Sequence, residues 1–123
     1  MKIMRIGIKS LGEGFSDFQE AFASAQRRHP FKAKKGAYFT SLGAARNFLT
    51  PRRLELLHVI KTRCPKSLYE LARLSGRSFP SIARDMALLA RHGLVQLNRN
   101  ASTPRRTVSP QVPYDAINLW IGI

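Results

Sequence analysis

The stretch SLYELARLSGRSFPSIARDMALLARHG, residues 67–93, determines how this chain of 123 residues is expected to fold. Ser67 and Glu70 form a capping box, in which the Glu70 carboxylate is placed to bond back to the backbone amide of Ser67. Gly76 ends the helix that begins there, and Ser78 caps a second helix, 78–92. Two amphipathic helices joined by a three-residue turn are typical of a helix-turn-helix.

The flanking segments extend this motif to a winged helix-turn-helix. Thr50 followed by Pro51 predicts the start of a preceding helix, 50–63, with an apolar stripe of Leu54, Leu57 and Ile60 beside Val59. After Gly93, residues 94–97 and 106–109 are expected strands on either side of a polar tip, 98–104. The chain then ends with an alternating segment, 116–121, which predicts a short C-terminal strand.

The N-terminal third is expected to form an extension of this domain. Residues 2–9 alternate and predict a half-buried strand, with Met4, Ile6 and Ile8 inward and Arg5 and Gly7 outward. A helix over 16–28 follows, and then a short strand at 37–39 and a helix over 41–48. The fold class is therefore α+β: a winged helix-turn-helix with an N-terminal strand-helix extension and a short C-terminal strand.

Two domains are expected, 1–36 and 37–123. The first strand has no neighbour close enough in sequence for a hairpin, and an unpaired edge invites pairing with another chain. Residues 1–36, and residues 1–30 above all, are therefore predicted to bind a partner or to dimerise, while residues 37–123 read DNA. The strand at 116–121, from the same chain or from a second copy, is the available partner.

The charge of the chain indicates a polyanionic partner. Lys and Arg number 21 against 7 Asp and Glu, which gives a net charge of +14 and a pI near 11.3. No apolar run approaches the length of a membrane span, and the basic and apolar residues of 1–10 are interleaved, unlike a signal peptide. One cysteine, Cys64, fits a reducing compartment. The expected location is cytoplasmic, on the nucleoid, and no membrane partner is expected.

The second helix of the motif carries the residues expected to contact double-stranded DNA. The helix and the turn before it are expected to contact DNA through Arg77, Ser78, Phe79, Ser81 and Arg84. Asp85 and Leu88 are also expected to face outward. Arg84 can reach guanine O6 and N7, Ser81 a base edge or phosphate, and Phe79 a thymine methyl, while Asp85 would orient Arg84. The wing, 97–107, offers Arg99, Arg105 and Arg106 to the backbone or the minor groove.

Several segments resemble known winged-helix proteins. SIARDM at 81–86, with Leu89 and HGLV at 92–95, resembles the recognition helix and wing of MarR-like regulators. FTSL at 39–42 and LTPRRLELL at 49–57 are similar to a family of archaeal and bacterial DNA-binding proteins with a short segment before the winged helix. The resemblance implies DNA contacts by Ser81 and Arg84. It also implies a transcriptional regulator or, as for some members, an antitoxin.

Other chemistry finds little support in the sequence. The three histidines, His29, His58 and His92, lie in separate elements without Cys, Asp or Glu at ligand spacing, so no metal site is expected. His92 beside Gly93 is expected to be a cation at a helix C-terminus, and Cys64 an inert structural thiol. No glycine-rich phosphate loop and no nucleophile-base pair occurs, so neither a cofactor nor an enzymatic activity is expected.

Three functions remain open from the sequence. The first is a sequence-specific regulator of transcription, a repressor that binds double-stranded DNA as a homodimer, since one recognition helix buries too little surface for strong specificity. The second is an antitoxin that binds a toxin protein through its N-terminal region and represses its own operon. The third is binding of RNA, which the small number of expected exposed aromatic side chains disfavours.

Overall fold

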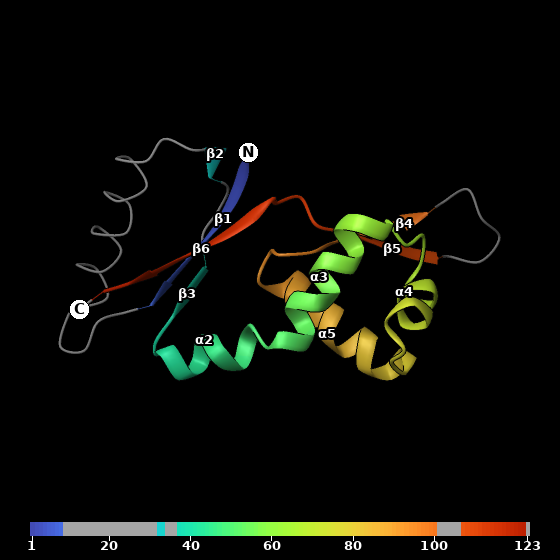
Figure 1. Ribbon diagram of the computed structural model, residues 1–123, viewed down its shortest axis with the longest axis horizontal. Helices are drawn as coiled ribbons and strands as arrows, with labels where there is room; N and C mark the ends of the chain where they lie inside the picture. Colours follow the sequence, from blue (N-terminus) through green and yellow to red (C-terminus); the bar gives the residue numbers. More distant parts are fainter. Residues whose placement is uncertain (9–31, 34–36, 101–106, 123) are drawn as a thin grey trace. The chain divides into compact units, whose positions relative to one another are not determined.

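The computed structural model describes residues 1–8, 32–33, 37–100 and 107–122, which belong to two compact units (Figure 1). The winged-helix unit comprises Thr50–Pro113. The sheet unit combines Met1–Leu49 with Tyr114–Ile123. The expected helix at 16–28 lies outside the described residues.

The winged-helix unit has the expected order of elements. Three helices follow one another and lead into a hairpin: α3 (Pro51–Arg63), α4 (Leu68–Ser75), α5 (Phe79–Arg91), β4 (Gln96–Asn100) and β5 (Thr107–Gln111) (Figure 1). This order confirms the winged helix-turn-helix and, with the strands of the sheet unit, the α+β class.

Side-chain caps determine where these helices begin. The hydroxyl oxygens of Thr50, Ser67 and Ser78 accept hydrogen bonds from the amide three residues ahead, at 3.2, 3.0 and 3.4 Å. The Glu70 carboxylate accepts from the amide of Lys66 at 3.2 Å, one residue before the expected Ser67. Gly76 ends α4 in the left-handed region, φ 67°, a conformation that glycine adopts without steric cost.

The core of the winged-helix unit lies among its three helices and the segment before β4. Buried apolar residues come from each of these elements: Leu56, Leu57, Ile60, Leu71, Ala72, Ile82, Met86, Leu89, Leu94 and Val95. The expected stripe on α3 was wrong at Leu54, which is exposed, and Leu56 takes its place. The reason is geometric: residues four apart, such as Leu56 and Ile60, share a helix face, whereas a strict spacing of three drifts around the helix.

The wing is an antiparallel hairpin in which Arg99 stands opposite Val108 and Asn98 opposite Ser109. The first strand of the hairpin begins at Gln96, two residues later than expected. Leu94 and Val95, which were expected in this strand, instead fill the core ahead of β4. Their burial ties the base of the wing to the helices.

The sheet unit is built on β1 (Lys2–Ile8), which is the central strand of a parallel sheet. β6 (Ala116–Ile121) pairs with it from Ile3 to Ile8, and the backbone groups of Lys2 and Asp115 also bond, amide to carbonyl, at 2.8 Å. β2 (Lys32–Ala33) and β3 (Ala37–Phe39) pair with the start and the end of β1. Because β6 occupies one edge of β1, β2 and β3 share the other edge.

For the first strand, the internal partner named from the sequence is confirmed: the segment 116–121 of the same chain, β6, pairs with one edge of β1, and β2 and β3 pair with the two ends of the other edge. The expectation of a half-buried strand was wrong. β1 is buried on both faces from Ile3 to Ile8, and even Arg5 is only 3% exposed. A strand at the centre of a parallel sheet is usually covered on both faces, so alternation does not mark a solvent side.

The division into units also differs from the expected boundary between residues 36 and 37. β3 and β6 pair with β1, and α2 (Leu42–Phe48) packs against β3 through the rings of Phe48 and Phe39, whose centroids are 5.1 Å apart. Residues 37–49 and 114–123 therefore join the N-terminal strand. The role of residues 1–36 as a partner-binding segment stays a prediction.

Candidate nucleic-acid interface

One face of α5 is exposed along its whole length. Its exposed residues are Pro80, Arg84, Ala87 and Arg91, spaced by three or four and hence aligned on one side of the helix. The opposite side carries Ile82, Met86 and Leu89, which are fully buried. Arg84 therefore stands at the middle of the solvent-facing side of α5, as predicted for a residue that contacts DNA.

Ser78 and Ser81 lie at the start of α5, and both take part in the cap. The Ser78 hydroxyl oxygen accepts the Ser81 amide, and the two hydroxyl groups lie 2.9 Å apart, with Ser78 donating. The Ser81 oxygen that accepts this bond keeps its own proton for another partner. Contact with DNA by either serine stays a prediction.

Phe79 does not project alone from the leading edge of α5. Its ring stacks on that of Tyr69 from the first turn of α4, with centroids 4.2 Å apart and an angle of 12° between the planes. Phe79 is half-buried, whereas Tyr69 is 68% exposed. Tyr69 was not among the residues predicted from the sequence, because its contact depends on the crossing of two helices.

Asp85 is buried, and the expectation that it faces outward and orients Arg84 was wrong. Its Oδ2 accepts from the Arg77 guanidinium at 2.6 Å and its Oδ1 from Nε of Arg53 at 3.3 Å. A buried carboxylate needs such partners, and two arginines supply them. Asp85 thereby links α3, the turn and α5. The guanidinium of Arg77, which was expected to contact DNA, donates to this buried carboxylate and is half-buried.

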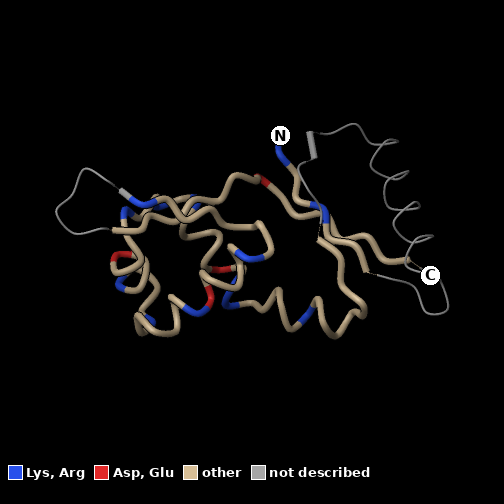
Figure 2. Tube along the Cα trace, turned by 180° about the vertical axis from the view of Figure 1, so that it is seen from behind, with Lys and Arg blue, Asp and Glu red and all other residues tan. Residues whose placement is uncertain are grey.

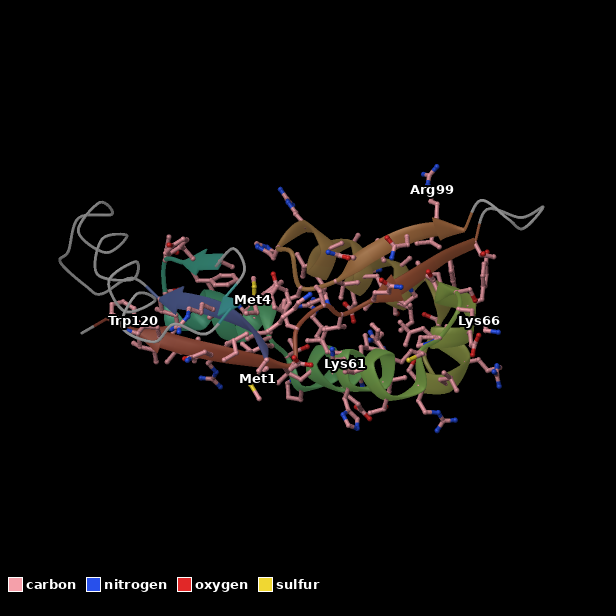
Figure 3. The ribbon with its side chains drawn as sticks, turned by 90° about the horizontal axis from the view of Figure 1, so that it is seen from above. Met1, Met4, Lys61, Lys66, Arg99 and Trp120 are labelled. Atoms are coloured by element: carbon pink, nitrogen blue, oxygen red, sulfur yellow. The ribbon has the colours of Figure 1, made fainter. Side chains whose placement is uncertain are left out.

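On the wing, Arg99 lies exposed on β4, and Figure 3 shows its side chain pointing away from the hairpin. Arg105 and Arg106, the two other wing arginines of the sequence analysis, lie outside the described residues. Their predicted contact with DNA stays a prediction.

The charge of the winged-helix unit is strongly positive. Its sequence holds 12 Lys and Arg against 3 Asp and Glu, a net charge of +9. The described part of the unit carries exposed cations on each of its helices and on the wing (Figure 2). Two of them, Arg73 on α4 and Arg91 on α5, were missed as candidates. Helical spacing could have found Arg91, since it follows Arg84 by seven residues, whereas Arg73 follows by four residues Tyr69, which was itself not a predicted contact.

The environment of the histidine at the end of α5 disfavours the cation expected there. Burial and the neighbouring Arg91 charge lower the pKa of His92. Cys64 is exposed at the end of α3. Within the described ranges, no three His, Cys, Asp or Glu side chains gather as metal ligands would.

The profile of the HVO_A0114 family matches residues 48–119, more than half of the chain and the whole of the winged-helix unit. The chain belongs to the HVO_A0114 family. The resemblance to MarR-like proteins is confirmed for the winged-helix kind, which the order of α3, α4, α5, β4 and β5 shows directly. The residues at 39–42 and 49–57 resemble a family of archaeal and bacterial DNA-binding proteins. Whether that family is the HVO_A0114 family stays a prediction.

No curated protein matches the chain. A solved structure, that of a MarR-like transcriptional regulator from Thermotoga maritima, is similar with 16% sequence identity and a TM-score of 0.46, over 81% of this chain. The chain spans 64% of the length of that regulator. Among the described residues, none of the helices has the length and apolar character needed to cross a bilayer.

Proposed function

We propose that this HVO_A0114-family protein is a transcriptional regulator, not an enzyme, that binds double-stranded DNA sequence-specifically. The observation that carries this proposal is the exposed side of α5, where Arg84 and Arg91 stand in line. The acid of this helix, Asp85, is turned inward to Arg53 and Arg77. The charged residues on the exposed side of α5 are thus both arginines.

The dimensions of α5 and of B-DNA agree with this function. An α-helix fits the major groove, where each base pair presents a distinct pattern of donors and acceptors. Arg84, exposed near the N-terminal half of α5, can donate two hydrogen bonds to guanine O6 and N7. We place α5 with its Ser78 cap in the major groove and the wing, 97–107, on the backbone or in the minor groove.

We further propose that the protein acts as a repressor and as a homodimer, with contacts between copies made by the sheet unit. One recognition helix buries too little surface for strong specificity, and two-fold pairing doubles it. Two large apolar residues of β6, Leu119 and Ile121, are nearly half exposed. Sedimentation of the full chain should show a dimer. A toxin partner stays a hypothesis of the sequence alone.

Selection from a pool of randomised duplexes tests the function directly. The full chain should enrich one sequence class, and that duplex should bind more tightly than a scrambled duplex of the same composition. Unlabelled RNA duplex of the same sequence should compete poorly, because the deep major groove of A-form RNA does not admit a helix. No enrichment, or equal competition by RNA, would contradict the proposal.

The wing is tested by the dependence of binding on salt. Arg99→Ala should reduce the slope of log binding constant against log salt concentration by about 1 for both the selected and the scrambled duplex. A protein that makes one phosphate contact fewer releases fewer counterions when it binds. Arg46→Ala, at an exposed arginine of α2 in the sheet unit, is the matched control and should leave the slope unchanged. An unchanged slope for Arg99→Ala would mean that this part of the wing does not touch DNA.

A further inference from the structure

The stacked rings of Tyr69 and Phe79 form an unusual surface feature of the winged-helix unit. Large aromatic side chains are normally placed in a core. Tyr69, however, is 68% exposed, and one face of its ring stacks on Phe79. Phe79 is the first residue of α5, directly after the Ser78 cap. The pair therefore stands where α5 begins, the end that a recognition helix turns toward base edges.

The surroundings of the pair are positively charged. Arg73 is exposed on α4, one helical turn after Tyr69. The nearby carboxylate, Glu70, accepts a bond from the backbone amide of Lys66 and is half-buried. An apolar surface beside an exposed arginine fits a partner that joins apolar groups to phosphates, and a DNA major groove is such a partner.

We infer that Tyr69 and Phe79 together read a thymine methyl group at the edge of the binding site. This inference rests on the proposed function and assigns a specificity-determining role to Tyr69. The thymine 5-methyl is the one apolar group that a base edge presents in the major groove. The Phe79 ring has no hydrogen-bonding group, so it can favour thymine through apolar contact alone.

Tyr69 acts as a positioning residue in this arrangement. A half-buried phenylalanine at the first position of a helix can change the orientation of its ring by rotation about its two side-chain torsions, χ1 and χ2. Stacking on Tyr69 at 4.2 Å holds the ring in one orientation and keeps water from one of its faces. The contact uses the ring of Tyr69 and not its hydroxyl, so a phenylalanine at position 69 should serve equally well.

Replacement of thymine by uracil in the selected duplex tests this inference. The two bases pair identically with adenine and differ by the methyl group alone. For the full-length protein, uracil at one thymine of the site should weaken binding about fourfold, the factor that corresponds to about 0.8 kcal/mol for one buried methyl. Tyr69→Ala should bring this ratio to about one, and Tyr69→Phe should keep it.

Leu54→Ala is the matched control, because Leu54 is a large exposed apolar residue on α3. It should keep the thymine preference. Thermal unfolding of each variant shows whether the fold is intact, as expected for changes at exposed positions. Indifference to uracil at every thymine, or an unchanged ratio for Tyr69→Ala, would overturn the inference.

The same experiment separates the inference from the proposed function. A selected duplex that needs Arg84 but is indifferent to uracil would overturn the thymine contact alone. Failure to select any duplex would overturn both. Single-stranded DNA that competes as well as the duplex, and loses this ability in Tyr69→Ala, would overturn methyl recognition in favour of base stacking on Tyr69.

Discussion

The winged-helix unit and the sheet unit differ in which side chains they bury and which they expose. In the winged-helix unit the helices bury apolar residues and expose arginines, and its net charge is +9. In the sheet unit β1 is buried on both faces, while β6 exposes Leu119 and Ile121. The first pattern suits a polyanion and the second suits packing against protein. The two units are therefore expected to respond differently to mutation.

The largest effect is expected in the sheet unit, at Ile6. Its side chain is 0% exposed at the centre of β1, so Ile6→Ala should lower the free energy of unfolding by about 2–5 kcal/mol through lost burial and a cavity. Leu42→Ala on α2 is the control, since Leu42 is 47% exposed, and should cost less than about 1 kcal/mol. Denaturant unfolding measures both. A loss at Leu42 as large as that at Ile6 would contradict the burial of β1 as the basis of the effect.

The next effect is expected at Asp85, the buried carboxylate of the winged-helix unit. Asp85→Ala leaves the guanidinium groups of Arg53 and Arg77 without their shared partner, which should lower the free energy of unfolding by about 1–3 kcal/mol. Glu55→Ala removes an exposed acid of α3 and should change it by less than about 0.5 kcal/mol. Equal effects of the two changes in denaturant unfolding would mean that Asp85 does not connect the helices.

A smaller effect concerns the pH dependence of stability at His92. Burial and Arg91 lower the pKa of this imidazole below 6.5, so the unfolded chain binds the proton more readily than the folded chain. The stability that the neutral imidazole contributes is present above pH 6.5 and is lost as the pH falls through the folded pKa. His92→Gln should remove this part of the pH dependence. An NMR titration that gives His92 a pKa above 6.5 would contradict the lowered pKa of the folded chain.

The winged-helix unit was predictable because its signals are local. The caps at Thr50, Ser67 and Ser78 act within three residues, and Gly76 sets its turn through its own backbone angle. The outward direction of Arg84 followed from the spacing of the buried residues around it. Such features need no knowledge of distant parts of the chain.

The remaining features depend on residues far apart in the sequence. Lys2 pairs with Asp115, and Asp85 pairs with Arg53, which lies on another helix. No spacing rule connects either pair. The strand at 116–121 could therefore be named as a partner of β1 only with the same chain and a second copy both left open, and the burial of Asp85 was missed. The stack of Tyr69 on Phe79 was missed for the same reason, because it requires the crossing of α4 and α5.

The most direct test of the central claim, that α5 reads duplex DNA through its exposed side, is the binding of Arg84→Ala. The full chain carrying this change should bind the selected duplex about 1–3 kcal/mol more weakly and the scrambled duplex nearly as well as before, because a base contact is lost. Its thermal stability should be unchanged, since Arg84 is exposed. An equal loss on both duplexes would reduce Arg84 to a phosphate contact, and no loss on either would contradict the account.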